Sequence, residues 1–173
     1  LYSEDSITIA PTLALDPNYN SSPGAYSITP TGVQLSNASN YQINYIDGTL
    51  YVNPLGVGTK KIRLSLDCVE EVINHPSGFN YVAHINYQNN NSTPIYIPMG
   101  SNNLIISGGQ NSGDPTEVFL PGTGSKDIYF DGSGFLWFLF SNQNNSLSYS
   151  LVYANRTTQK CLSAKKTSSV VAQ

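Results

Sequence analysis

The two cysteines of the 173-residue chain, Cys68 and Cys161, are its clearest candidates for chemistry. An even pair in a chain rich in Asn, Ser and Thr and poor in Lys is typical of a disulfide made in an oxidising compartment. In the chain-entropy model, a bond that closes so long a loop stabilises the fold by about 4–5 kcal/mol. We therefore predict a Cys68–Cys161 disulfide; the alternative is two unpaired thiols, one or both of them buried.

The two histidines add neither a metal site nor a catalytic base to this pair. His75 and His84 are too few to complete a tetrahedral zinc set, and neither cysteine has a C-x-x-C partner. A Ser–His–acid site also needs a nucleophile on a strained turn, and the G-x-S-x-G motif is absent. Glu70 and Glu71 are adjacent, so they point to opposite sides of a strand and do not suit paired-carboxylate chemistry. The sequence predicts a protein that is not an enzyme.

Two aspartates form a weak cation candidate. Asp127 and Asp131 flank a short expected strand, and Asp131 begins an Asp-Gly-Ser-Gly turn that could wrap a calcium ion. No loop brings three acids together, however, and a turn is sufficient reason for the Asp-Gly pair. The sequence therefore predicts no cofactor and no metal site, with calcium at Asp127 and Asp131 as a weak alternative.

Aromatic side chains provide a candidate contact surface. In the run from Phe135 to Phe140 both strand faces are apolar, whereas a sandwich strand normally buries only one. We expect a loop or the neighbouring domain to cover the second face, which holds Phe138 and Phe140; the alternative is an exposed binding patch. Tyr129, Tyr149 and Tyr153 could supply stacking platforms for sugar rings, although ordinary sheet packing accounts for them about as well.

Charge is scarce and unevenly placed. Charged residues make up 11% of the chain, the net charge is −3, and the first 59 residues hold four acids and no base. This balance lacks the basic surface that nucleic acid or an anionic membrane attracts, so neither is predicted as a partner. The longest apolar run, 135–140, is far below the ~18 residues of a membrane span, so no membrane insertion is predicted. Leu1 begins without a signal-peptide pattern, and we expect the chain to be part of a longer protein.

Strands are expected to position all of these residues. Apolar residues recur with period two, and turn signals separate segments at roughly 8–12-residue spacing, which predicts an all-β fold of the sandwich or barrel type. Leu64, Leu66 and Cys68 alternate with polar residues and are expected on one buried face, and Trp137 and Leu139 are expected in the core. The expected strands are 7–10, 25–29, 41–45, 49–53, 61–68, 81–87, 95–98, 103–107, 116–120, 126–130, 135–140, 147–153 and 160–162.

The first part of the chain contains a clear hairpin pattern. Asp47-Gly48 is suited to a tight type I′ turn between strands 41–45 and 49–53. The spaced patterns G-x-Y-x-I at 24–28, N-Y-x-I-x-Y at 40–45 and D-G-T-L-x-V at 47–52 then make residues 6–53 resemble the MBG domain, a mostly-β repeat of long bacterial surface adhesins. The resemblance implies further strands upstream of Leu1.

The second part is similar to a module found near the ends of secreted multidomain bacterial proteins. The shared features are an early Cys-Val, a Tyr-x-Ala strand, an Ile-Pro-x-Gly and a Phe-x-Pro-Gly turn, an apolar strand around a Trp (Leu-x-Trp-x-Leu in the module, Leu-Trp-Phe-Leu here) and a closing Cys. Here they stand at 68–69, 81–87, 97–100, 119–122, 136–139 and 161. The resemblance implies an Ig-like antiparallel sandwich and an exported location, and it implies no chemistry.

These patterns together predict two small domains. Residues 1–53 form an MBG-like β domain, 54–59 a linker, and 60–173 an Ig-like β-sandwich with a C-terminal tail from about 163. Apolar contacts around Leu55 and Val57 are expected to stiffen the joint. The predicted function is a non-enzymatic stalk or adhesive module of a large secreted or cell-surface bacterial protein, with neighbouring domains of the same chain and surface glycans as partners. The alternative is a carbohydrate-binding module of an exported adhesin or enzyme.

Overall fold

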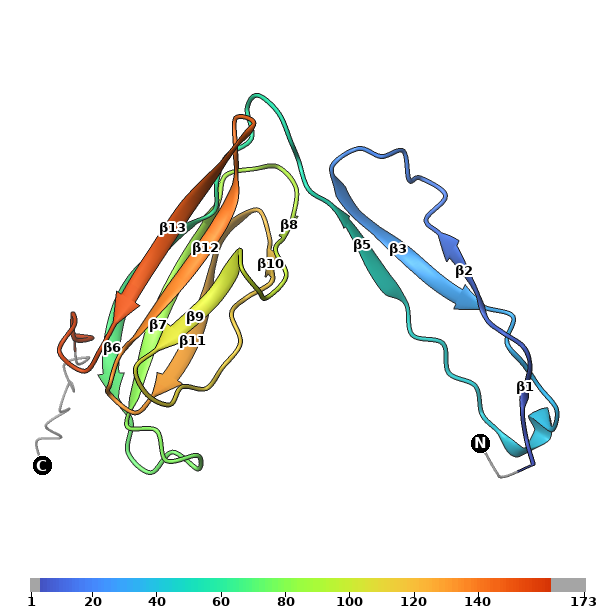
Figure 1. The fold of residues 1–173 in the computed structure, drawn as a ribbon, viewed down its shortest axis with the longest axis horizontal. Coiled ribbons are helices and arrows are strands. Elements are labelled where there is room, and N and C mark those ends of the chain that lie inside the picture. The colour runs from blue at the N-terminus through green and yellow to red at the C-terminus, as the bar shows by residue number, and fades with distance from the viewer. Residues whose placement is uncertain (1–3, 163–173) are drawn as a thin grey trace, which may run out of the picture.

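Strands dominate the computed structural model, which describes residues 4–162. The described chain forms two lobes joined by the segment after strand β5 (Figure 1). Within residues 4–162 all pairings between named strands are antiparallel, and the regular elements other than strands amount to one 3₁₀ turn. The prediction of an all-β fold is confirmed.

The small lobe, residues 4–52, is a single layer. A three-stranded sheet has the order β2-β3-β5, and β1 pairs with β4 beside it. The elements are β1 (Ile7–Ile9), β2 (Thr12–Leu15), β3 (Gly24–Thr31), β4 (Gln34–Leu35), the 3₁₀ turn η1 (Ala38–Asn40) and β5 (Gly48–Val52).

This lobe has an apolar face but no core. Leu15 lies opposite Ile28 across one edge of β3, and Tyr26 lies opposite Leu50 across the other, so these side chains share one face of the sheet. Within residues 4–58 no residue is buried. The hydrogen-bonded ladder of the sheet therefore contributes more of the small lobe's order than apolar packing does.

The predicted hairpin 41–52 is wrong. Residues 41–47 form no strand, and Gly48 opens β5 opposite Ile28 of β3. The eight-residue β3 gives β5 a hydrogen-bonded ladder along its edge and gives Leu50 an apolar neighbour. A hairpin between 41–45 and 49–53 would leave this edge of β3 unpaired. The extended segment is held by side chains instead: the Tyr45 hydroxyl accepts a hydrogen bond from the Val33 amide at 3.1 Å.

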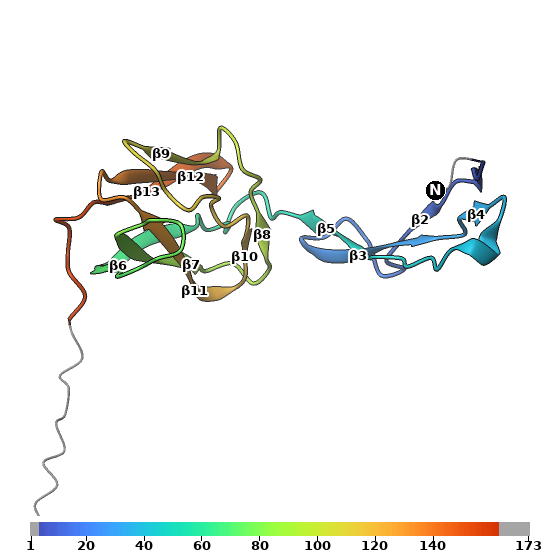
Figure 2. The same ribbon diagram turned by 90° about the horizontal axis from the view of Figure 1, so that it is seen from below.

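The large lobe consists of two three-stranded sheets packed face to face (Figure 2). One has the order β11-β7-β6 and the other β13-β12-β9, with a short β8–β10 pair at the side nearer the small lobe. The strands are β6 (Arg63–Glu71), β7 (Tyr81–Asn89), β8 (Ile95–Tyr96), β9 (Asn103–Ser107), β10 (Val118–Phe119), β11 (Gly122–Phe130), β12 (Phe135–Gln143) and β13 (Ser146–Ala154).

The core lies between these two sheets and is organised around Trp137. Its indole is 1% exposed, Leu139 beside it is fully buried, and both sit on the inward face as predicted. The indole N–H donates to Oδ1 of buried Asn103 at 2.9 Å. The Asn103 amide in turn donates to the carbonyls of Ile97 and Thr116, so each buried polar atom of this group has a partner.

Besides 41–45, three predicted strands are shorter than expected or absent. Segments 95–98 and 116–120 pair over only two residues each, because Pro94, Pro98 and Pro115 lack the amide that a longer ladder needs. Segment 160–162 forms a single parallel bridge between Val69 and Lys160. The tail predicted from about 163 lies outside the described residues.

No helix in residues 4–162 has the length and apolar character that crossing a bilayer requires.

Candidate functional site

The outer surface of the β13-β12-β9 sheet is the most prominent candidate site. Register places Ile106, Leu136 and Tyr153 in one cross-strand row, and Leu104, Phe138 and Leu151 in the next. Phe140 and Tyr149 form a third row, with Leu147 beyond it. We call this set the apolar face: Leu104, Ile106, Leu136, Phe138, Phe140, Leu147, Tyr149, Leu151 and Tyr153.

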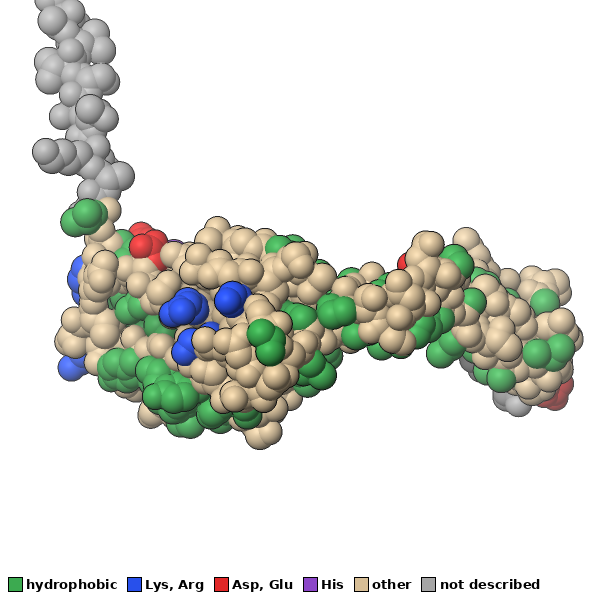
Figure 3. All heavy atoms as spheres, turned by 90° about the horizontal axis from the view of Figure 1, so that it is seen from above, with side chains coloured by type: hydrophobic (Ala, Val, Ile, Leu, Met, Phe, Trp, Pro, Cys, Tyr) green, Lys and Arg blue, Asp and Glu red, His purple; other side chains and the backbone are tan. Residues whose placement is uncertain are grey.

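The apolar face is open to solvent in the described chain. Tyr149 is 57% exposed, Tyr153 and Ile106 are similarly exposed, and Phe138 and Phe140 are half-buried among their neighbours. Figure 3 shows hydrophobic side chains gathered along one flank of the large lobe. The expectation that a loop or the neighbouring domain covers this face is therefore wrong for residues 4–162, and the alternative of an exposed patch describes it better.

Strand β13 explains how this face arises. Its sequence alternates Leu147, Tyr149, Leu151 and Tyr153 with smaller residues, and simple patterning would bury the large set. The structure does the reverse, because Ser150 and its small neighbours face inward where β6 passes close by. The Ser150 hydroxyl accepts a hydrogen bond from the Leu64 amide at 2.8 Å, and Ser141 of β12 does the same for Ile62. The close approach of β6 therefore requires small residues inside and leaves the large ones outside.

The aromatic candidates divide between two sites. Phe138, Phe140 and Tyr149 lie together, with the Phe138 and Phe140 rings near-parallel at 6.5 Å between centroids. Tyr129 lies on β11 of the opposite sheet, and its ring packs against His75 at 4.5 Å. Tyr129 is therefore not part of the apolar face, since the two sheets have opposite outer sides.

A crevice of about 240 Å³ adjoins the apolar face at the joint between the lobes. Phe140 and Leu147 line one side of it, and amide side chains, among them Asn102 and Asn142, contribute polar groups. We call it the joint crevice. Its mixture of an aromatic ring and amide groups is the combination that sugar-binding sites use.

The joint itself is held by Asn53, which sequence reasoning missed. Its side-chain amide donates to the Tyr96 carbonyl at 2.7 Å and accepts from the Tyr96 amide at 2.8 Å, so it pairs with β8 as a strand residue would. The Tyr51 and Tyr96 rings stack at 5.3 Å. Leu55 and Val57, in contrast, are 74% and 91% exposed, so the prediction that they stiffen the joint is wrong.

The predicted Cys68–Cys161 disulfide is confirmed. It fastens the segment after β13 to β6, where the Val69 amide donates to the Gln159 carbonyl and the Cys161 amide donates to the Val69 carbonyl. Lys160 adds an ion pair with Glu71 at 3.6 Å. The bond thus joins the strand that opens the large lobe to the segment that closes it.

Cys68 stands on the outer face of β6, opposite to the expected side. A bulge at Asp67 shifts the register, so Leu66 pairs with Ile85 while Cys68 pairs with His84. His84 is itself paired with Asp127 of β11, and the three residues form one row across the sheet. Simple alternation from Leu66 could not reveal this shift.

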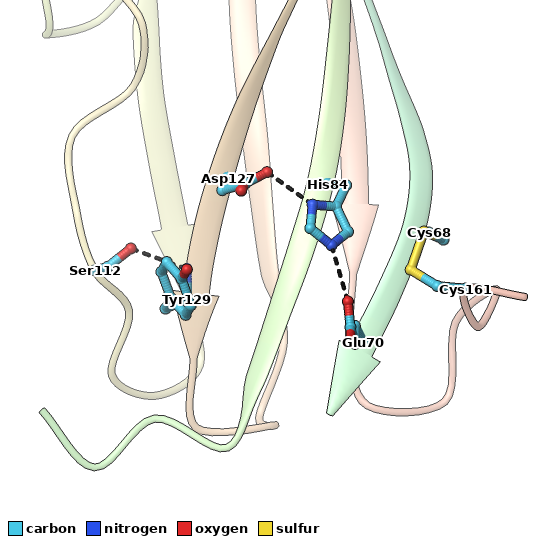
Figure 4. Close-up of polar contacts among 7 residues, drawn as sticks. All are labelled: Cys68, Glu70, His84, Ser112, Asp127, Tyr129 and Cys161. Carbon is cyan, nitrogen blue, oxygen red and sulfur yellow. Dashed lines mark hydrogen bonds and ion pairs between the residues drawn. A yellow bond between two sulfur atoms is a disulfide. The ribbon is translucent and has the colours of Figure 1, made fainter. Parts of the chain in front are cut away.

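A polar cluster surrounds His84 on this outer face (Figure 4). Its Nδ1 lies 2.8 Å from Asp127 and its Nε2 lies 3.5 Å from Glu70. Partial burial lowers the pKa of His84, but the hydrogen bond and charge of Asp127, followed by those of Glu70, outweigh it, so the net pKa is raised. We call Cys68, Glu70, His84, Asp127 and Cys161 the His84 cluster.

The two aspartates named as calcium candidates have different hydrogen-bond partners. Asp127 faces His84, whereas Asp131 accepts hydrogen bonds from the Ser133 and Gln110 amides, each at 2.9 Å. These amides, led by that of Ser133, hold the pKa of Asp131 below its usual value. Asp131 is therefore engaged in its own turn, and the structure does not bring the two carboxylates together around one position.

Comparisons of the chain with family models, with curated proteins and with solved structures found no match.

Proposed function

We propose that this chain is a non-enzymatic structural and adhesive segment of a secreted or cell-surface bacterial protein, and that the apolar face is its contact surface. One observation carries the proposal. In β13 the large side chains Tyr149, Leu151 and Tyr153 point outward while Ser150 points inward, so the exposed apolar surface is built into the strand. An apolar patch of this extent on a sheet is typical of an interaction site.

Two further features support an exported, structural role. A half-exposed disulfide persists where thiols are oxidised, as outside the bacterial cytoplasm. The Asn53 and Tyr96 contacts tie the small lobe to the large one. We further propose that residues 6–53 are an MBG-like repeat and that the large lobe is an Ig-like module, on the motifs that carry those resemblances.

Binding of carbohydrate is the second candidate function. The half-buried ring of Phe140 lines the joint crevice, which supplies amide donors and acceptors, and the exposed ring of Tyr149 lies next to Phe140. Sugars are bound by such pairs of a flat apolar ring and a nearby hydrogen-bonding group. Under this proposal the partner is a surface glycan, bound across Phe140 and Tyr149.

The first test measures attachment of beads that carry the whole chain to a panel of protein-coated and glycan-coated surfaces. Tyr149→Ser combined with Leu151→Ser should abolish attachment while changing the melting temperature little, since both side chains are about half exposed. Leu13→Ser, which changes a more exposed apolar residue of the small lobe, is the control and should attach as wild type does. Equal attachment by all variants would exclude the apolar face as the contact surface.

Phe138→Ser separates the two candidate functions. If the face packs against a neighbouring domain or another protein, the variant should lose affinity for protein-coated surfaces. It should also lose about 1–2 kcal/mol of stability, because the Phe138 ring no longer buries apolar area between Leu104 and Leu151. If the face binds sugars, retention on an insoluble polysaccharide should fall most in Tyr149→Ser. A glycan array with the whole chain that shows no binding would remove the carbohydrate candidate.

A further inference from the structure

The disulfide and its neighbouring histidine have the donor set of a metal site. One ligand atom each from Cys68, His84 and Cys161 lie within 4.8 Å of one another. All three residues are half-buried on the outer side of the β11-β7-β6 sheet, so ions and small reductants can reach them. They come from three places in the chain, namely β6, β7 and the segment after β13.

The spacing is close to what zinc requires. With zinc–sulfur bonds near 2.3 Å and zinc–nitrogen bonds near 2.0 Å, donors in a tetrahedral site lie roughly 3.4–3.8 Å apart. The three donors therefore need movements of about an ångström, once the sulfur atoms are no longer bonded to each other. The bulge at Asp67 makes this arrangement, since it places Cys68 directly across from His84.

The surroundings of His84 match those of a metal-bound imidazole. Asp127 occupies Nδ1 at 2.8 Å, which fixes the ring and leaves Nε2 as the nitrogen for a metal. Glu70 lies 3.5 Å from Nε2, and its exposed carboxylate can turn to supply a fourth ligand. Asp127 at Nδ1 and Glu70 near Nε2 are therefore observations that point to a metal site independently of the two cysteines.

We propose that the dithiol form of this chain binds zinc through Cys68, Cys161 and His84, with Glu70 as the fourth ligand and Asp127 as the residue that orients His84. The disulfide form lacks two of the ligands and does not bind. Two electrons and two protons from an external dithiol convert the disulfide to two thiols. Zinc then displaces both thiol protons and keeps its oxidation state. An external disulfide reverses the change by thiol–disulfide exchange: it accepts two electrons from the two thiolates and two protons from water to leave as a dithiol, the Cys68–Cys161 bond forms again, and Zn²⁺ is released.

This site would hold the closing segment in place in both redox states. In the disulfide form the bond to Cys68 keeps Cys161 on β6, and in the dithiol form the shared metal ion does so. The hydrogen bonds between Val69 and residues Gln159 and Cys161 would be retained in each state. The proposal does not depend on the adhesive function proposed above, because it concerns the opposite outer side of the large lobe.

Cobalt is the probe for this site. The whole chain is reduced with a dithiol, freed of reductant without oxygen, and titrated with Co²⁺. We expect one equivalent to give the visible bands of tetrahedral cobalt and a near-ultraviolet thiolate-to-cobalt band, all removed by one equivalent of Zn²⁺. The disulfide form should show neither band. Absence of both bands in the reduced chain, or a reduced chain that loses its sheet signal in circular dichroism and does not regain it with metal, would overturn the proposal.

Variants assign the ligands. His84→Ala should weaken Co²⁺ binding at least tenfold, and Asp127→Asn, which changes only the residue behind the histidine, should weaken it about 10–100-fold. Glu70→Gln should alter the visible bands, which report the fourth ligand. His75→Ala, the other histidine of the chain, is the control and should bind as wild type does. If His84→Ala binds as tightly as wild type, the thiols bind metal without this site and the assignment is wrong.

Discussion

Asn103 is the residue on which the large lobe's interior depends most. It is fully buried and connects Trp137 of one strand with the carbonyls of Ile97 and Thr116 in two loops. A buried polar group that loses its partner costs about 1–3 kcal/mol, and here three groups share one side chain. The network therefore ties the irregular segments around β8 and β10 to the core.

Asn103→Ala should lower the free energy of unfolding by about 3 kcal/mol or more, because the indole N–H and both carbonyls lose their partner. Urea denaturation monitored by Trp fluorescence measures it directly, since Trp137 is the only tryptophan. Asn102→Ala, the exposed neighbour, should change the midpoint little. Similar midpoints for both variants would contradict this account.

A second single residue, Asp131, makes the stability of the fold depend on pH. Its pKa is held below the ordinary value by the Ser133 and Gln110 amides, so the ionised form stabilises the native turn above that ordinary value. This stability is lost as the pH falls through the lowered folded pKa. Thermal melts between pH 7 and about pH 2 should show a shallower acid dependence in Asp131→Asn than in wild type; parallel curves would show that Asp131 contributes nothing.

At the scale of the element, β13 is a strand whose pattern misleads. Ser150→Leu should destabilise the large lobe by about 1–3 kcal/mol, because it overfills the space beside β6 and removes the acceptor of the Leu64 amide. Leu151→Ser, on the exposed side, should cost less than about 1 kcal/mol. Polarity alone suggests that Leu151 is buried and Ser150 exposed, so that Leu151→Ser would lower the melting temperature more. We expect the opposite order, and a lower melting temperature for Leu151→Ser than for Ser150→Leu would refute the inward orientation of Ser150.

The elements also show what the sequence alone can and cannot predict. Period-two alternation was enough to predict β7, short apolar runs between turn signals were enough for β9 and β12, and the large apolar area of the indole was enough for the inward position of Trp137. Such local signals failed where a choice depended on a distant partner. β5 pairs with β3 rather than with the residues next to it, and the bulge at Asp67 turns Cys68 outward.

Some residues of the candidate sites could be predicted from the sequence, and others could not. Both cysteines and the second apolar face of β12 were predictable from spacing and composition. The partners Asn53 and Tyr96, 43 residues apart, were not, because a side chain that substitutes for a strand leaves no periodic signal. The grouping of Glu70, His84 and Asp127 likewise depends on the order of strands β6, β7 and β11, which no local pattern specifies.

For the whole molecule, the joint between the lobes is expected to be stiff for a different reason than the sequence indicates. Asn53→Ala removes both hydrogen bonds to the Tyr96 backbone and should let the small lobe reorient. Small-angle scattering should then show a larger mean radius of gyration or a broader distribution of distances. Leu55→Ser combined with Val57→Ser should leave the profile unchanged, because both side chains are already exposed. A wild-type profile that already fits freely moving lobes would contradict the stiff joint.

The place of the disulfide in the chain also decides how the molecule would behave under tension. When the two ends of the chain are pulled apart, the force is transmitted along β6 to Cys68 and through the covalent bond to Cys161. The residues between the two cysteines are therefore not stretched. The enclosed loop spans 93 positions, and at about 3.3–3.6 Å per residue it keeps roughly 300 Å of contour length out of reach. Optical-trap traces should therefore lengthen by about that amount per molecule only after a reductant is added. The sandwich would then act as an inextensible link whose reserve of length is released chemically.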